Sequence, residues 1–190
     1  MQISKTLYVT RRDEWRRWLE KHFKKEQDIW LVFYRKETGK PRIPYNDAVE
    51  EALCFGWIDS NVKRLDDERY AQRFSPRRPG TGYSQTNKER LKKLLKQGKV
   101  VQAVLKTLPA DLLSDKFEIP ADIIESIRAD KEAWRNFKKF PERYKRIRIG
   151  FIEGARNRPL EFRKRLSYFI RMSRENKLFG FGGVDVYYSD

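Results

Sequence analysis

Hydrophobic positions near the N-terminus follow a helical spacing and then change to a strand pattern. Behind Thr10, the expected N-cap, four residues fall at positions i, i+3, i+4 and i+7: Trp15, Trp18, Leu19 and His22. They predict an amphipathic helix that extends to about residue 24. The continuous β-branched and aromatic run at residues 29–34 suits a strand better than a helix.

Helical spacing returns twice before residue 107. Pro44 opens a predicted helix that Gly56 ends, because proline fits the first turn of a helix and glycine fits the position after the last. A further helix is predicted from Thr86, since Glu89 three residues later completes a capping box, and Gly98 ends it. A short helix follows at residues 99–107.

Between these helices the pattern predicts an antiparallel hairpin. Residues 62–65 and 70–74 are short extended segments on either side of a charged turn. Side chains alternate between the two faces of a strand, so Arg73 points away from the face of Phe74. We expect Arg73 to reach Asp59 from that position.

The remaining hydrophobic pattern is helical. Helices are expected from residue 121, around Trp134 and Phe137, from Pro141, and at 160–178. Residues 109–120 are interpreted as a linker, and the glycine-rich 181–190 as a flexible tail. We therefore predict an α+β fold, with a small, mainly antiparallel sheet and packed helices at 1–108, followed by a helical region at 121–180.

The composition excludes several kinds of site. The 190 residues are 39% hydrophobic and 14% aromatic, which is enough to build a core. Cys54 is the single cysteine and His22 the single histidine, so an internal disulfide, a Cys/His zinc site and a His-dependent triad lack their residues. We expect no cofactor and no metal. The sequence contains no apolar run typical of a secretion signal or a membrane span, so we expect a cytoplasmic protein.

The positive charge is concentrated in the C-terminal third. The net charge is +16, and residues 131–180 hold 16 Lys and Arg against five Asp and Glu. On the helix predicted at 160–178, five basic side chains project within an arc of roughly 140°: Arg163, Lys164, Arg171, Arg174 and Lys177. Such a ridge attracts nucleic acid or another polyanion. A solvated helix face is the alternative interpretation.

A second cluster of polar and aromatic residues surrounds the predicted hairpin and the helix after it. Its members are Trp57, Asp59, Arg73, Arg77, Arg78, Ser84, Asn87 and Arg90. The arginines precede a helix N-terminus, where unpaired backbone amides and the helix dipole favour a phosphate or carboxylate. Two alternatives stay open. Either Trp57 belongs to the core and Arg73 pairs with Asp59, or Asp59 is the general base of an enzyme that acts on an anionic metabolite.

The chain resembles the YdeI/OmpD-associated (OmdA-like) family, also described as bacteriocin-protection proteins. In the N-terminal part the resemblance is carried by residues 51–59, Glu-Ala-Leu-Cys-Phe-Gly-Trp-Ile-Asp, by residues 74–78, Phe-Ser-Pro-Arg-Arg, and by Ser84, Asn87 and Arg90. In the C-terminal part it is carried by Trp134, Phe137, Tyr144, Ile152, Glu153, Ala155 and Arg163 to Arg165. Two positions depart from the family pattern: Tyr83 stands where Trp is common, and Lys99-Val100 where a Met commonly follows the glycine.

The resemblance implies a part in stress or bacteriocin protection, without a defined chemistry. The N-terminal part is also similar to a YjbR/CyaY-like α+β superfamily that includes suspected DNA binders. From the residues and the resemblance together we expect a non-enzymatic protein that binds an anionic ligand or acidic partner through the residues between Trp57 and Arg90. Nucleic-acid binding through the basic helix, and an enzyme acting on an anionic metabolite, remain the alternatives.

Overall fold

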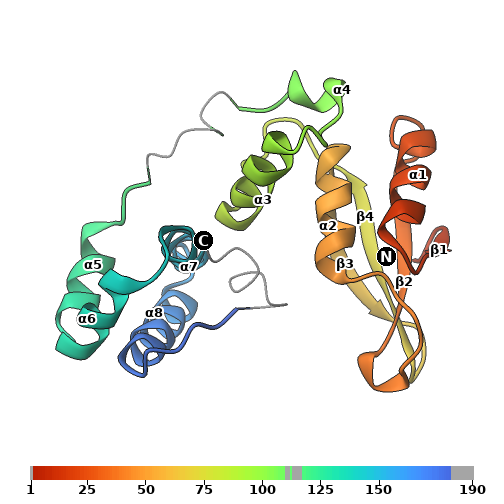
Figure 1. The fold of residues 1–190 in the computed structure, drawn as a ribbon. Helices are drawn as coiled ribbons and strands as arrows, with labels where there is room; N and C mark the ends of the chain where they lie inside the picture. Colours follow the sequence, from red (N-terminus) through yellow and green to blue (C-terminus); the bar gives the residue numbers. More distant parts are fainter. Residues whose placement is uncertain (1, 110–111, 113–116, 181–190) are drawn as a thin grey trace. The chain divides into compact units, whose positions relative to one another are not determined.

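The protein is described by a computed structural model that covers residues 2–109, 112 and 117–180 (Figure 1). The chain divides into two compact units. The first comprises Met1–Thr81 and Leu91–Pro109, and the second comprises Gly82–Arg90 and Ala110–Asp190. The predicted tail at 181–190 lies outside the described residues, as do positions 110–111 and 113–116 of the predicted linker.

The first unit is built on a four-stranded sheet in the order β1-β2-β4-β3. The strands are β1 (Thr6–Tyr8), β2 (Ile29–Tyr34), β3 (Trp57–Arg64) and β4 (Arg69–Pro76). β2 pairs with β4, and β4 with β3, in antiparallel register, whereas β1 lies parallel to β2. The predicted α+β class is confirmed, and the sheet is mixed rather than purely antiparallel. β1 was not predicted.

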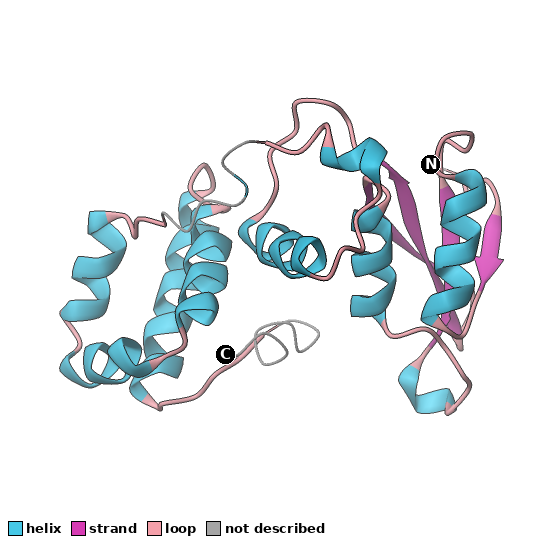
Figure 2. Ribbon diagram, turned by 45° about the horizontal axis from the view of Figure 1, so that its top comes forward, coloured by secondary structure: helices cyan, strands magenta, loops and turns pink. Residues whose placement is uncertain are grey.

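Two helices, α1 (Arg12–His22) and α2 (Tyr45–Cys54), lie side by side over this sheet (Figures 1 and 2). Aromatic residues of α1 form the contact, because the Trp15 ring lies 5.5 Å from that of Phe74 and the Trp18 ring 5.8 Å from that of Trp57. β2 lies between β1 and β4 and carries five consecutive buried residues. The first helix begins after Arg11, one residue later than the predicted cap at Thr10, and its Glu14 carboxylate accepts both the Thr10 and the Arg11 backbone N–H.

Gly56 turns the chain from α2 directly into β3. Its φ of +71° is readily reached by glycine alone, and a Cβ there would lie 3.1 Å from a methyl group of Val104 in α4 (Gln102–Leu105). The predicted helix end at Gly56 is therefore confirmed. The strand that follows starts at Trp57, so β3 is longer than the predicted segment at 62–65. A short 3₁₀ helix, η1 (Lys36–Thr38), follows β2.

The second unit is helical. It contains α5 (Ala121–Arg128), α6 (Lys131–Lys139), α7 (Glu142–Glu153) and α8 (Pro159–Arg174). Its core is mainly aromatic and β-branched, formed by Ile123, Ile127, Phe137, Phe140, Tyr144, Ile149, Ile152 and Phe169. α8 ends four residues before the predicted Leu178, because Asn176 adopts a φ of +53°, which breaks a helix.

Helix α3 (Gln85–Lys96) contributes to both units, with residues 85–90 in the second and 91–96 in the first. It starts earlier than predicted, since the Ser84 hydroxyl accepts the Asn87 backbone N–H at 3.3 Å, the geometry of an N-cap. Within the second unit α3 approaches α7 closely: a Cβ at Gly150 would lie only 2.4 Å from the Cβ of Gln85. Glycine at 150 permits this approach.

Candidate functional site

Trp57 and Asp59 lie on one face of β3 and bind partners inside the first unit. Trp57 is 1% exposed, and its Nε1 donates to the Phe23 carbonyl at 3.1 Å. The Asp59 carboxylate accepts the Tyr45 hydroxyl at 2.6 Å. Trp57 is therefore a core residue, which is one of the two alternatives that the sequence left open.

Arg73 does not reach Asp59, contrary to prediction. In the β3–β4 register Asp59 stands opposite Phe74, so these two side chains share a face and Arg73 projects from the other. On that face the Arg73 Nε donates to Asp28 at 2.7 Å. The Asp28 side chain is mostly buried, which would raise its pKa, but hydrogen bonds from Ser4 and Arg73 outweigh this and hold the pKa below its usual range.

Arg77 and Arg78 occupy the segment that follows β4. The Arg77 backbone N–H donates to the Gly56 carbonyl at 2.9 Å, and its Nη2 donates to the Thr81 carbonyl at 3.1 Å. Arg78 is exposed. Arg77 thus ties the loop to the end of α2, while the Arg78 side chain points into solvent.

The three remaining residues of the predicted cluster belong to the second unit: Ser84 directly precedes α3, and Asn87 and Arg90 lie on it. Ser84 caps the helix, and the buried Arg90 donates to the Asn87 side-chain oxygen at 2.9 Å. The structure thus brings Ser84, Asn87 and Arg90 together. The residues from Trp57 to Arg78 belong to the first unit.

Glu89, also on α3, is held by basic side chains of α7. It is 2% exposed, and Arg146 binds both of its carboxylate oxygens, at 2.8 and 3.1 Å. Arg143 lies 3.7 Å away and the Gln85 side chain donates at 2.9 Å. Glu89 was predicted to close a capping box with Thr86. Instead it neutralises part of the charge of α7.

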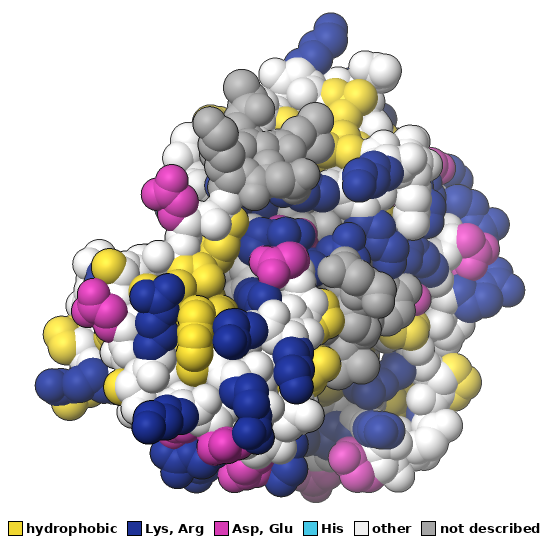
Figure 3. All heavy atoms as spheres, turned by 60° about the vertical axis from the view of Figure 1, so that its left-hand side comes forward, with side chains coloured by type: hydrophobic (Ala, Val, Ile, Leu, Met, Phe, Trp, Pro, Cys, Tyr) yellow, Lys and Arg dark blue, Asp and Glu magenta, His cyan; other side chains and the backbone are white. Residues whose placement is uncertain are grey.

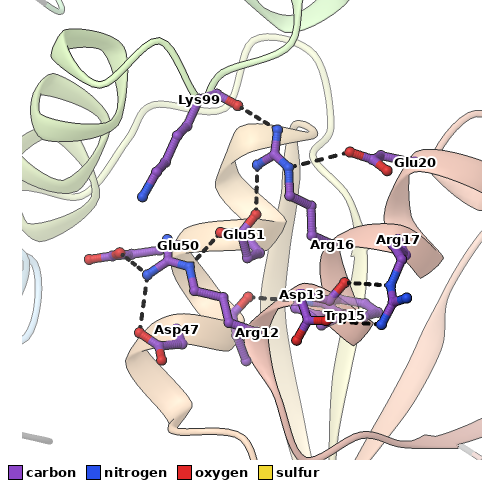
Figure 4. A network of polar contacts seen from close by, with 11 residues as sticks. Arg12, Asp13, Trp15, Arg16, Arg17, Glu20, Asp47, Glu50, Glu51 and Lys99 are labelled. Carbon is purple, nitrogen blue, oxygen red and sulfur yellow. Dashed lines mark hydrogen bonds and ion pairs between the residues drawn. The ribbon is translucent and has the colours of Figure 1, made fainter.

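A partly buried ion network between α1 and α2 was not predicted (Figure 4). Arg12 contacts Asp47, Glu50 and Glu51 at 3.1, 2.9 and 2.5 Å, and Arg16 contacts Glu51 at 2.8 Å. Glu50 and Glu51 are 1% and 2% exposed. Burial alone would lower the pKa of Arg12, but the two glutamates outweigh it and raise that pKa, so the ion pairs persist at neutral pH.

Cys54 lies at the end of α2, beside this network. Burial raises the pKa of its thiol to about 12, and the negative charge of Glu51 acts in the same direction. A thiol with such a pKa is almost entirely protonated at neutral pH and is a poor nucleophile. Cys54 is therefore a packing residue.

The predicted basic ridge lies on α8 and just beyond it. Arg163, Lys164 and Arg171 are exposed, and within the described parts of the chain none of them forms an ion pair with a carboxylate. Arg174 instead pairs with Asp130, the N-cap of α6, through its Nε at 2.6 Å. Lys177 lies after the end of α8 and binds Glu175 at 2.8 Å.

Beside this ridge, arginine and aromatic side chains contact one another across α7, α8 and the segment after α8. We call this set the arginine–aromatic row: Arg165, Phe151, Arg148, Phe179, Tyr168 and Arg171. The guanidinium groups of Arg165 and Arg148 lie 3.8 and 4.9 Å from the centre of the Phe151 ring. Sequence reasoning missed the row because its members come from three segments.

The row continues through Phe179. Arg148 lies 4.1 Å from the centre of the Phe179 ring, which meets Tyr168 edge-on at 4.8 Å, and Arg171 lies 5.0 Å from the centre of Tyr168. Phe151 and Tyr168 remain 44% and 41% exposed. Figure 3 looks from the side on which α5 and α6 are drawn in Figure 1, and shows Lys and Arg side chains spread over that face with hydrophobic side chains between them.

The described residues contain neither a typical metal site nor a typical membrane span. Among them, no group of three or more His, Cys, Asp or Glu side chains is arranged to hold a metal ion. None of the helices in that part of the chain combines the length and the apolar character that crossing a bilayer requires.

Comparison with known proteins gives two family matches. Residues 7–107 match a family described as a domain of unknown function (DUF8412), and residues 116–176 match the family described as bacteriocin-protection, YdeI or OmpD-associated. No curated protein and no solved structure matches the chain significantly. The chain therefore belongs over its first half to the DUF8412 family and carries, at residues 116–176, a domain of the bacteriocin-protection, YdeI or OmpD-associated family.

Proposed function

We propose that the protein is a non-enzymatic binding protein whose second unit holds a polyanion, nucleic acid in the first place, on the exposed side of α8. The observation that carries this proposal is the set of exposed cations Arg163, Lys164 and Arg171, which have no carboxylate partner among the described residues. The protection named in the family description would then depend on this binding.

The neighbouring arginines make the contrast clear. Three arginines of the second unit form ion pairs within it: Arg146 with Glu89, Arg156 with Asp122, and Arg165 with Glu161. Ion pairs of this kind neutralise charge locally, whereas cations without a carboxylate on one helix side add their fields and attract phosphates. At a rise of about 1.5 Å per residue, residues 163 to 171 span about 12 Å of the helix, enough to reach successive phosphates.

The loop at Arg77 and Arg78 supports anion binding less well. Arg73 forms an ion pair with Asp28, and Arg77 donates a hydrogen bond to a carbonyl in its own loop. Trp57 lies in the core and offers no surface to a ligand. Binding at α8 is therefore the stronger of the two expectations drawn from the sequence.

The test is a salt titration of binding to a labelled 20-base-pair DNA duplex, followed by fluorescence anisotropy. For the native chain we expect the logarithm of the affinity to fall linearly with the logarithm of the salt concentration. The variant Arg163→Ala/Lys164→Ala/Arg171→Ala should lower the affinity and reduce that slope by about 0.9 for each phosphate that the variant no longer binds.

A matched variant controls for net charge. Lys21, Lys36 and Lys106 are exposed lysines of the first unit, and Lys21→Ala/Lys36→Ala/Lys106→Ala removes the same total charge. It should bind almost like the native chain. If both triple variants lose affinity equally, binding follows net charge alone and the α8 site is refuted. Absence of binding to the duplex and to a single strand of the same length, even at low salt, refutes the proposed function as a whole.

A further inference from the structure

The arginine–aromatic row combines positive charge with exposed aromatic rings. Exposed arginines alone would serve for a phosphate backbone, yet two large rings, Phe151 and Tyr168, are left more than two-fifths exposed among them. Water solvates aromatic faces poorly, so two such rings beside a basic ridge indicate a ligand that has both negative charge and flat apolar surfaces.

We propose that the row prefers single-stranded over duplex nucleic acid, with Phe151 and Tyr168 as stacking platforms for unpaired bases. This inference rests on the proposed function, because the α8 cations supply the attraction to phosphates. A duplex keeps its base faces stacked inside and offers the row only its backbone. A single strand exposes those faces, and stacking on an aromatic side chain contributes about 1–3 kcal/mol per base.

The arginines of the row suit the same ligand. A guanidinium group is planar and stacks on bases as well as binding phosphate. Arg171, at one end of the row, is exposed and forms no ion pair with a described carboxylate, while Arg165, at the other end, is oriented by Glu161 at 2.7 Å. Arg148, which contacts Phe151 and Phe179, is buried, so the row offers a ligand mainly the two exposed rings and the exposed Arg171.

Charge distinguishes this partner from a protein with an apolar patch. Residues 131–180 carry a net charge of +11, from 16 basic and five acidic residues. An uncharged apolar partner would gain nothing from that field, and it would have to desolvate the arginines that flank both rings. A strand with one phosphate per base matches both components of the surface.

The experiment compares three labelled 20-residue probes by fluorescence anisotropy: an oligothymidine strand, an abasic strand with the same backbone, and a DNA duplex. The abasic strand retains the phosphates but has no bases. We expect the native chain to bind oligothymidine at least 10-fold more tightly than the abasic strand, which corresponds to about 1.4 kcal/mol. The variant Phe151→Leu/Tyr168→Leu should remove that preference, because leucine offers no ring on which a base can stack.

Tyr8→Leu is the matched control, because Tyr8 is an aromatic residue of the first unit with 44% exposure. It should keep the preference for oligothymidine, and far-UV circular dichroism should show that every variant retains its helices. Equal affinity of the native chain for the oligothymidine and abasic strands overturns this inference, while salt-dependent binding of the duplex would still support the proposed function. If Phe151→Leu/Tyr168→Leu keeps the full preference, the platforms are not these two rings and the inference also fails.

Discussion

The close approach of α3 to α7 predicts that Gly150→Ala destabilises the second unit. In the interior of a helix, replacing glycine by alanine normally stabilises by about 1 kcal/mol. At Gly150, however, the added Cβ would lie 2.4 Å from the Cβ and 3.0 Å from the Cγ of Gln85. Carbon atoms in ordinary contact are about 3.5–4.0 Å apart, so one of the two helices must shift.

The size of the effect follows from these two opposing contributions. Overpacking a closely packed contact costs about 1–3 kcal/mol, and the upper part of that range applies here because a Cβ is fixed to its backbone. After subtracting the gain in helix propensity, we expect a net loss of about 1–2 kcal/mol in the free energy of unfolding. Urea unfolding followed by circular dichroism at 222 nm should show a lower midpoint with an unchanged slope.

Two further variants identify the cause. Gly154→Ala, where the added Cβ would have no neighbour closer than 3.4 Å, should stay within about 0.5 kcal/mol of the native chain. The double variant Gln85→Gly/Gly150→Ala removes the clashing atoms, so the two substitutions should show a favourable coupling of about 1–2 kcal/mol. A Gly150→Ala variant as stable as the native chain would show that α3 and α7 are not in contact at this point.

Three other predictions concern charge and the thiol. Glu51→Gln should lower the free energy of unfolding by about 1–3 kcal/mol in urea titrations, because it removes the buried carboxylate that Arg12 and Arg16 share, while Asp47, Glu50 and Glu20 still pair with these arginines. Glu20→Gln, at a half-exposed partner of the same network, should cost less than about 1 kcal/mol. The pKa of Asp130 is lowered by the Ala133 backbone N–H and by Arg174, so its contribution to stability is complete above about pH 4 and is lost as the pH falls through the lowered folded-state pKa. Asp130→Asn should therefore be less stable than the native chain at pH 7, and the difference in stability should shrink as the pH falls below about 4. A difference that stays the same at acidic pH would refute the charge contribution. Cys54 should react with a thiol reagent at pH 8 only in urea, and rapid labelling of the folded protein would contradict the burial that raises its pKa.

Long periodic segments were predictable from the sequence, whereas contacts between distant segments were not. α1 and α2 follow the helical spacing of their apolar residues, and β2 follows its continuous β-branched and aromatic run. β1 has three residues, too few to show a pattern. β3 contains an irregular register between Asp59 and Val62, which interrupts its alternation and hid its first half.

The same limit applies to the candidate site. The cations of α8 were predicted because they share one helix, and their spacing is local. The partner of Arg73 was not, because Asp28 lies 45 positions earlier and is brought close through the pairing of β2 with β4. The arginine–aromatic row required the packing of α7 against α8, which no local spacing encodes.

Helix α3 has a consequence for dividing the protein into fragments. The gap between the two family matches, at residues 108–115, is an obvious place to cut, but the first six residues of α3 fold with the second unit. A fragment ending in the gap would expose the carboxylate of Glu89, and one beginning there would deprive Arg146 of that carboxylate and Gly150 of its contact with Gln85. A peptide of residues 82–97 added to the C-terminal fragment should restore these contacts. Each of the two units therefore needs its own part of α3 to be complete.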